Sequence, residues 1–332
     1  MSLMILEKGA LESWVEALMA EQRVVGPRSK GPRFVFGPLA DASELRLDYN
    51  TTILPPKAAL QPPEERLVKY SLSAEPGVET IIEAEPTVLL GVHTCDLHAV
   101  RLLDEAFGSE HPDAHYLERR RQTTIVSLEC LQPCDEHSFC KDMGTLTADD
   151  GYDLHLTDIG EAYAVHAATE KGEALLGKRA EVRAADDDDV RRLNEVLSAK
   201  WPCFQHRLQF DSKELPSLLA TAHEHPLWKE LGERCFACGS CTNVCPTCYC
   251  FNVTDEVDMV QTEGVRTRRW DSCQLDEFAL VAGGESFREA RSARQRHRFM
   301  RKGKYLFEKF DTLGCVGCGR CVRTCLVHIS IV

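Results

Sequence analysis

Two runs of four cysteines in the C-terminal part of this 332-residue chain constrain its fold most strongly. Both runs have the spacing Cys-x2-Cys-x2-Cys-x3-Cys. They consist of Cys235, Cys238, Cys241 and Cys245, and of Cys315, Cys318, Cys321 and Cys325. Three thiolates on so short a loop can surround one face of an iron–sulfur cubane, but the fourth is too far along the chain to reach the same cluster. The spacing therefore predicts two [4Fe–4S] clusters.

The fourth cysteine of each run is expected to bind the cluster of the other run, as in bacterial ferredoxins with two clusters. The predicted ligand sets are Cys235, Cys238, Cys241 and Cys325 for the first cluster, and Cys315, Cys318, Cys321 and Cys245 for the second. Zinc is the alternative, although zinc sites usually combine two pairs of ligands. Two features depart from the ferredoxin pattern: Leu326 replaces the usual proline, and residues 246–314 separate the runs.

The chain contains 16 cysteines, and its N-terminus resembles no secretory signal. Disulfide bonds explain so many cysteines poorly in a reducing compartment, so we expect a cytoplasmic protein whose thiols bind metal, carry out redox chemistry or are buried. No apolar stretch is long enough to span a membrane. The net charge of −13 disfavours binding of nucleic acid over the whole surface.

The hydrophobic pattern predicts an α+β fold in two domains. Residues 1–208 are expected to form an α/β domain, with buried strands at 86–92 and 124–128 and further β structure at 153–166. Residues 209–332 are expected to form a mainly helical, ferredoxin-like domain with two clusters and a basic insertion. The pattern also predicts a helix over residues 3–20, a loop at 26–32, and a helix capped by Asp96.

A third group of cysteines lies in the N-terminal domain and consists of Cys95, Cys130, Cys134 and Cys140. Cys95 and Cys130 each follow a predicted strand, and α/β sheets bind ligands at the carboxyl ends of parallel strands. These four thiols are candidates for a third [4Fe–4S] cluster. Two alternatives remain open: a zinc site formed by Cys130, Cys134, His137 and Cys140, and separate buried thiols.

Four further cysteines have no motif, namely Cys203, Cys248, Cys250 and Cys273. The last three could be additional ligands, a thiol site or packing beside a cluster. Residues 266–309 carry 12 Lys and Arg against 6 Asp and Glu. This basic segment is either a solvated helix face or a set of cations that offsets negative clusters or docks an acidic partner; its candidates are Arg288, Arg291, Arg294 and Arg298.

The sequence contains neither a Gly-x-Gly-x-x-Gly turn after a strand nor a phosphate-binding P-loop. We therefore predict no flavin or nicotinamide site in this chain, and we identify no catalytic residue.

In combination, these motifs resemble the β subunit of cytoplasmic NiFe hydrogenases, also called sulfhydrogenases, and the related iron–sulfur subunit of anaerobic sulfite reductase. The C-terminal resemblance rests on CFACGSCTNVCPTCYCF, RTRRWDSC, RQRHRF and CVGCGRC. The N-terminal resemblance rests on ILPPK, GVHTCDLHAVRLLD and CLQPCDEHSFC, so it extends over nearly the whole chain.

The resemblance implies an electron-transfer protein with a flavin-containing, NAD(P)H-linked subunit on one side and the small and large subunits of a NiFe hydrogenase on the other. The cysteine motifs expected of a NiFe-binding large subunit are missing, so hydrogen chemistry must occur elsewhere. The alternative is a protein that acts directly in sulfur, polysulfide or sulfite reduction. In that case Cys248, Cys250 and Cys273 would be the candidate thiols, because a thiolate beside a cluster can accept sulfur.

Overall fold

The computed structural model describes residues 3–73, 75–177 and 180–332. In these residues the larger sheet has eight strands in the order β10-β1-β9-β8-β7-β6-β2-β3. Its strands are β1 (Met4–Glu7), β2 (Arg23–Lys30), β3 (Arg33–Pro38), β6 (Thr87–His93), β7 (Thr123–Leu128), β8 (Leu154–Asp158), β9 (Ala162–Ala167) and β10 (Val182–Ala184). Strands β2, β6, β7 and β8 run parallel, and the outer strands pair antiparallel. The predicted α+β fold class, with an α/β sheet in the N-terminal region, is confirmed.

Helices cover both faces of this sheet. Strand β6 has apolar side chains on both of its faces, and each face packs against helices. Val88 and Leu90 pack in one core with α1 (Leu11–Met19) and α4 (Glu170–Gly177). Leu89 and Val92 pack in the opposite core with α2 (Thr94–Gly108) and α3 (Ala114–Gln122). Every residue of β6 and β7 is buried, as expected for central parallel strands.

Several local predictions are confirmed and others are wrong. The strands predicted at 86–92 and 124–128 are β6 and β7, and residues 153–166 contain the hairpin β8–β9. The predicted loop at 26–32 is instead part of the hairpin β2–β3. Pro27 is tolerated there because β2 pairs with β6 only from Arg23 to Val25. The helix predicted over 3–20 begins only at Leu11, after β1.

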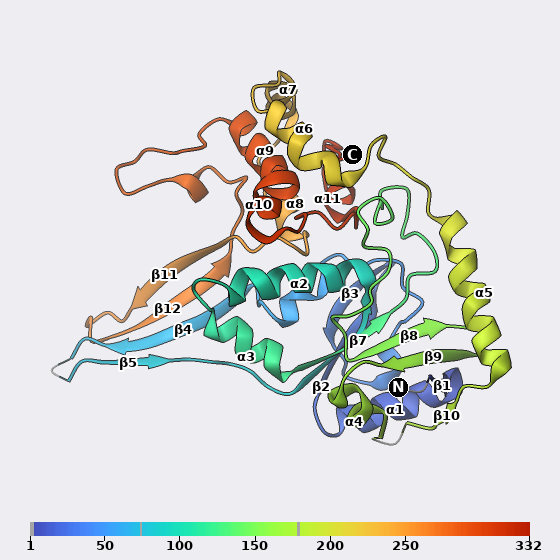
Figure 1. The fold of residues 1–332 in the computed structure, drawn as a ribbon. Coiled ribbons are helices and arrows are strands. Elements are labelled where there is room, and N and C mark those ends of the chain that lie inside the picture. Colours follow the sequence, from blue (N-terminus) through green and yellow to red (C-terminus); the bar gives the residue numbers. More distant parts are fainter. Residues whose placement is uncertain (1–2, 74, 178–179) are drawn as a thin grey trace.

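A second, four-stranded sheet has the order β11-β12-β4-β5 and projects to one side of the molecule in Figure 1. It consists of β4 (Glu64–Ser71), β5 (Gly77–Thr80), β11 (Phe251–Val257) and β12 (Glu263–Trp270). The expectation of helix within the insertion is therefore wrong for residues 251–270. Strand β12 pairs with β4, which comes from the other side of the expected boundary at residue 208. The sequence does not reveal such a distant partner.

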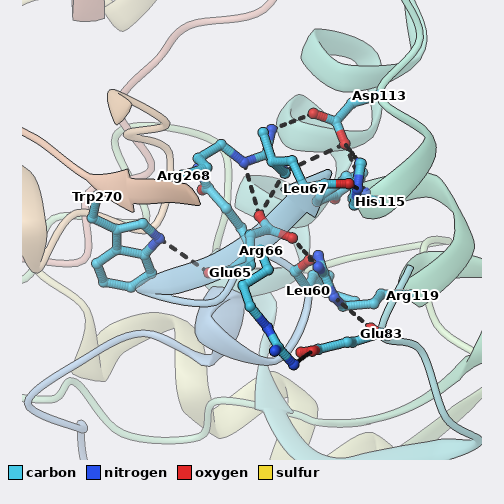
Figure 2. A network of polar contacts seen from close by, with 12 residues as sticks. Leu60, Glu65, Arg66, Leu67, Glu83, Asp113, His115, Arg119, Arg268 and Trp270 are labelled. Carbon is cyan, nitrogen blue, oxygen red and sulfur yellow. Dashed lines mark hydrogen bonds and ion pairs between the residues drawn. The ribbon is translucent and has the colours of Figure 1, made fainter. Parts of the chain in front are cut away.

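A buried ion network attaches the insertion to the N-terminal region (Figure 2). Glu65 on β4 lies between Arg119 on α3 and Arg268 on β12, and the Arg268 Nε–Glu65 Oε1 distance is 2.8 Å. Arg268 also pairs with Asp113, whose carboxylate caps the N-terminus of α3. All the charges in this network have opposite partners, as burial requires. The hairpin β11–β12 is therefore held firmly in place.

Of the remaining helices, the first lies beside β8 and β9 in Figure 1, and the others lie beyond α2, where the cysteine runs are found. In chain order these helices are α5 (Asp187–Cys203), α6 (Leu215–Thr221), α7 (Leu227–Arg234), α8 (Ser240–Asn243), α9 (Arg291–Met300), α10 (Leu306–Phe310) and α11 (Arg320–Arg323). Helices α7 and α9 approach closely at Gly232, where a Cβ atom would lie 2.5 Å from the Ser292 backbone nitrogen. None of the helices in the described residues is long and apolar enough to cross a membrane.

Candidate iron–sulfur centre

The two cysteine runs fold into loops of the same shape. The first contains Ala237 (φ 55°) and Gly239 (φ 75°), and α8 follows directly. The second contains Gly317 (φ 67°) and Gly319 (φ 71°) at the equivalent positions, and α11 follows. Two left-handed residues in each loop curl the backbone, so that the cysteines gather on its inner side. Helices α8 and α11 pack against each other, which brings the two loops together.

Each loop lines a cavity together with the last cysteine of the other loop. The first cavity is lined by Cys235, Cys238, Cys241 and Cys325, with Gln274, Gln295 and Arg298 among its other neighbours. The second cavity is lined by Cys315, Cys318, Cys321 and Cys245, together with Cys241, Cys248, Arg298 and Lys302. Each predicted ligand set therefore meets in one place, including the cysteine contributed by the distant run.

Two buried cations fit the negative charge of thiolate-bound clusters. Arg298 lines both cavities, and its Nη2 is buried without a hydrogen-bond partner. Lys302 donates to Thr247 Oγ1. Burial alone would lower the pKa of each cation, but the charges of nearby cysteines, including Cys245 and Cys248, raise both pKa values above their ordinary range. Neither forms an ion pair with a carboxylate in the described residues, so an anionic cluster would supply the missing charge.

A single metal ion finds no assembled site among the described residues, because no three His, Cys, Asp or Glu side chains there lie close enough together to hold one. In the N-terminal region this holds for the zinc alternative of Cys130, Cys134, His137 and Cys140, and equally for the set of Cys95, Cys130, Cys134 and Cys140. At the two C-terminal sites the thiols surround a cavity, which suits a cubane whose four iron atoms are bound at separate corners.

The third group of cysteines assembles beside the second cavity. Cys95 lies in the first turn of α2 and Cys130 follows β7, and β6 and β7 are parallel neighbours as predicted. Cys95 and Cys140 belong to an apolar cluster against which Cys130 and Cys318 pack. Burial raises the pKa of Cys95, and the negative charges of Asp96, Cys130 and Cys318 raise it further. Cys134 lies at the edge of this group, where its Sγ donates to Asn50 O over 2.9 Å.

A buried ion pair joins the third group to the second loop. Asp96 does not cap α2, where His93 is the N-cap residue; it accepts two hydrogen bonds from Arg320, at 2.6 and 2.7 Å. The segment that leads to Cys140 also touches the second cysteine loop through its backbone, because Phe139 N donates to Gly317 O over 2.8 Å. A Cβ at Gly317 would lie 2.6 Å from Cys140 N, so this contact needs glycine.

The cysteines without a motif form two contacts near the cavities. Cys248 hydrogen-bonds to the predicted ligand Cys245. Cys250 hydrogen-bonds to Cys273, which lowers the pKa of Cys273 to about 6. Cys203 lies apart from both and hydrogen-bonds to Ala199 O.

The basic helix α9 is only partly solvated. Arg294 and Arg298 are buried, Arg294 pairs with Asp276, and Arg291 donates to Cys235 O over 2.8 Å. No motif in the sequence points to Gln295, whose Nε2 lies 2.9 Å from Cys235 Sγ. The sequence also contains no motif that indicates the role of Lys302 or the pairing of Asp96 with Arg320.

Comparison with known proteins assigns the class first. Residues 234–329 match the family model of the 4Fe-4S dicluster domain, so the C-terminal region is that of an iron–sulfur protein with two clusters. Over 309 residues the chain is 35% identical to sulfhydrogenase 2 subunit beta of Pyrococcus furiosus, which covers 93% of this chain and 90% of that protein. The chain therefore belongs to the family of sulfhydrogenase β subunits, as its motifs suggested. No solved structure matches it.

Proposed function

We propose that this chain relays electrons through three successive [4Fe–4S] clusters. The observation that carries the proposal is the continuity of the three cysteine groups. Cys241 lines both the first and the second cavity, and Cys318 of the second cavity packs against Cys95 and Cys140 of the third group. A row of neighbouring one-electron centres suits transfer through the protein.

The proposed ligands are those predicted from the sequence. The first cluster is assigned to Cys235, Cys238, Cys241 and Cys325, the second to Cys315, Cys318, Cys321 and Cys245, and the third to Cys95, Cys130, Cys134 and Cys140. The clusters would supply reversible one-electron chemistry. The chain's own residues set the potentials, because buried cations and N–H donors to sulfur favour the reduced, more negative state. Arg298, Lys302 and Gln295 are the residues positioned for this role.

The relay would operate in a multi-subunit complex in the cytoplasm. The relative from P. furiosus is a sulfhydrogenase subunit by name. We propose that a flavin-containing, NAD(P)H-linked subunit lies at one end of the relay and the small and large subunits of a NiFe hydrogenase at the other. Electrons would then pass between NAD(P)H and hydrogen chemistry without a substrate site in this chain.

Electron paramagnetic resonance of the anaerobically purified complex tests this relay. Hydrogen alone and NAD(P)H alone should each produce the signals of reduced [4Fe–4S] clusters. A complex with Cys318→Ser should lose exchange between hydrogen and NAD(P)H while each end module keeps its activity with artificial dyes. Undiminished exchange in a complex whose β subunit lacks iron would reject the proposal.

Direct reduction of sulfur species is a second candidate function. It is favoured by the position of Cys248 at the second cavity and of Cys250 against Cys273. Cys248→Ser and Cys273→Ser should then reduce the sulfur-dependent turnover of the complex while hydrogen-dependent dye reduction stays unchanged. If both variants keep full turnover with sulfur, this candidate fails.

A further inference from the structure

The contact between Cys250 and Cys273 is separate from all three proposed cluster sites. Both thiols are free, and they hydrogen-bond to each other. The backbone N–H of Cys273 also donates to the sulfur of Cys250. Neither residue lines the first or the second cavity formed by the described residues. An explanation other than cluster ligation is therefore needed for these two neighbouring thiols.

The scaffold that holds this pair is rigid. Cys250 immediately precedes β11 and Cys273 follows β12, so the paired ends of the hairpin set their separation. Asp271 N donates to Cys250 O over 3.0 Å, which closes the same end. Trp270 is anchored by its Nε1 to Gln61 O over 3.1 Å, within the network of Figure 2. The hairpin therefore keeps the two cysteines side by side at this end.

A buried chain of amides connects the pair to the first cluster site. Gln274 Nε2 lies 3.5 Å from Cys273 Sγ. Gln295 Nε2 donates to Gln274 Oε1 over 2.8 Å and lies 2.9 Å from the sulfur of Cys235, a proposed ligand of the first cluster. Both glutamines are 1% exposed. Two redox-capable thiols thus lie one short polar path from a proposed electron carrier.

We infer that Cys250 and Cys273 form a redox-active dithiol that exchanges two electrons with the neighbouring clusters. On oxidation, both S–H bonds break and one Sγ–Sγ bond forms. Two protons would leave through Cys250, which is only partly buried, and two oxidised [4Fe–4S] clusters would accept one electron each. Two reduced clusters reverse the step. The site adds a two-electron store to a relay of one-electron carriers. The inference rests on the proposed function only because the clusters are its electron acceptors.

Peptide mapping of the full, cluster-loaded chain tests this inference. Trypsin cuts after Arg266 and Arg269, so Cys273 lies on residues 270–288 and Cys250 lies on residues 235–266. Samples poised oxidised or reduced are quenched in acid, alkylated in denaturant and digested without reductant. The oxidised sample should contain a disulfide-linked pair of these peptides, and the reduced sample should contain both in alkylated form. Limited reduction of the clusters should reopen the link.

Two variants make the result specific. Cys250→Ser should abolish the link while its iron content equals that of the wild type. Cys248→Ser, only two positions away, should retain the link. The inference is overturned if Cys273 is fully alkylated in the oxidised wild type, if the link survives Cys250→Ser, or if Cys250→Ser loses one cluster's iron. If the clusters are reduced by hydrogen and by NAD(P)H but Cys273 never forms a disulfide, only the dithiol is rejected. If the disulfide forms but neither hydrogen nor NAD(P)H reduces the clusters, only the relay is rejected.

Discussion

The two cysteine loops have the same spacing and backbone turns but very different surroundings. In the first loop Cys238 is exposed, and Phe236, between the first two cysteines, is 64% exposed. In the second loop the equivalent residue, Val316, is 4% exposed and packs in the apolar cluster with Cys95 and Cys140. One loop therefore faces the surface, while the other lies between the first loop and the N-terminal cysteines.

The two loops also differ at the residue that follows the second left-handed glycine, Gly239 in the first loop and Gly319 in the second. In the first loop it is Ser240, whose hydroxyl lies 3.4 Å from Cys238 Sγ. In the second loop it is Arg320, which is buried and neutralised by Asp96. Spacing thus sets the shape of a cluster loop, whereas its neighbours determine whether it is an outer terminus or an inner link.

The largest difference between the loops should come from the buried ion pair. Asp96→Ala leaves Arg320 buried without a counter-charge, which should lower the free energy of unfolding by about 3–5 kcal/mol. Ser240→Ala removes only a weak polar contact of the first loop and should cost at most about 1 kcal/mol. Chemical denaturation of both variants measures the difference. Equal losses would show that the two loops are supported in the same way.

A smaller difference is expected at the first left-handed position of each loop. Gly317→Ala introduces a Cβ into the Phe139–Cys140 backbone at positive φ, which should cost at least about 1–3 kcal/mol. Alanine already occupies the equivalent position 237, so Ala237→Gly should change stability by less than about 1 kcal/mol. Thermal unfolding followed by iron release compares them. A Gly317→Ala chain as stable as the wild type would contradict the close docking of the second loop.

Arg298 should affect both loops through charge rather than stability alone. Arg298→Met removes a buried cation beside both cavities, so reduction of both clusters should become less favourable. A tenfold change in the reduction equilibrium corresponds to about 59 mV, and we expect a decrease of that order. Redox titration followed by electron paramagnetic resonance measures it. Arg296→Met is the matched control, because Arg296 on the same helix pairs with Glu224, and unchanged potentials are expected there.

The sequence predicted the family and the dicluster domain of this protein better than its long-range structure. Cys95 and Cys130 could be grouped because each follows an apolar segment that reads as a buried strand, and the cysteine runs carry their own spacing. The pairing of β12 with β4 could not be predicted, because Arg266–Arg269 read as a basic surface segment until Glu64 and Glu65 are seen opposite. For the same reason Asp96 was expected to cap a helix, since its partner Arg320 lies 224 residues away.

The central claim is that the inner loop connects the cluster pair to a third cluster held by the N-terminal cysteines. Iron and acid-labile sulfide analysis of the anaerobically reconstituted chain tests it most directly. About 12 iron atoms per chain are expected, and about 8 after Cys95 and Cys130 are both replaced by serine. About 8 iron atoms in both the wild type and the double variant would contradict it.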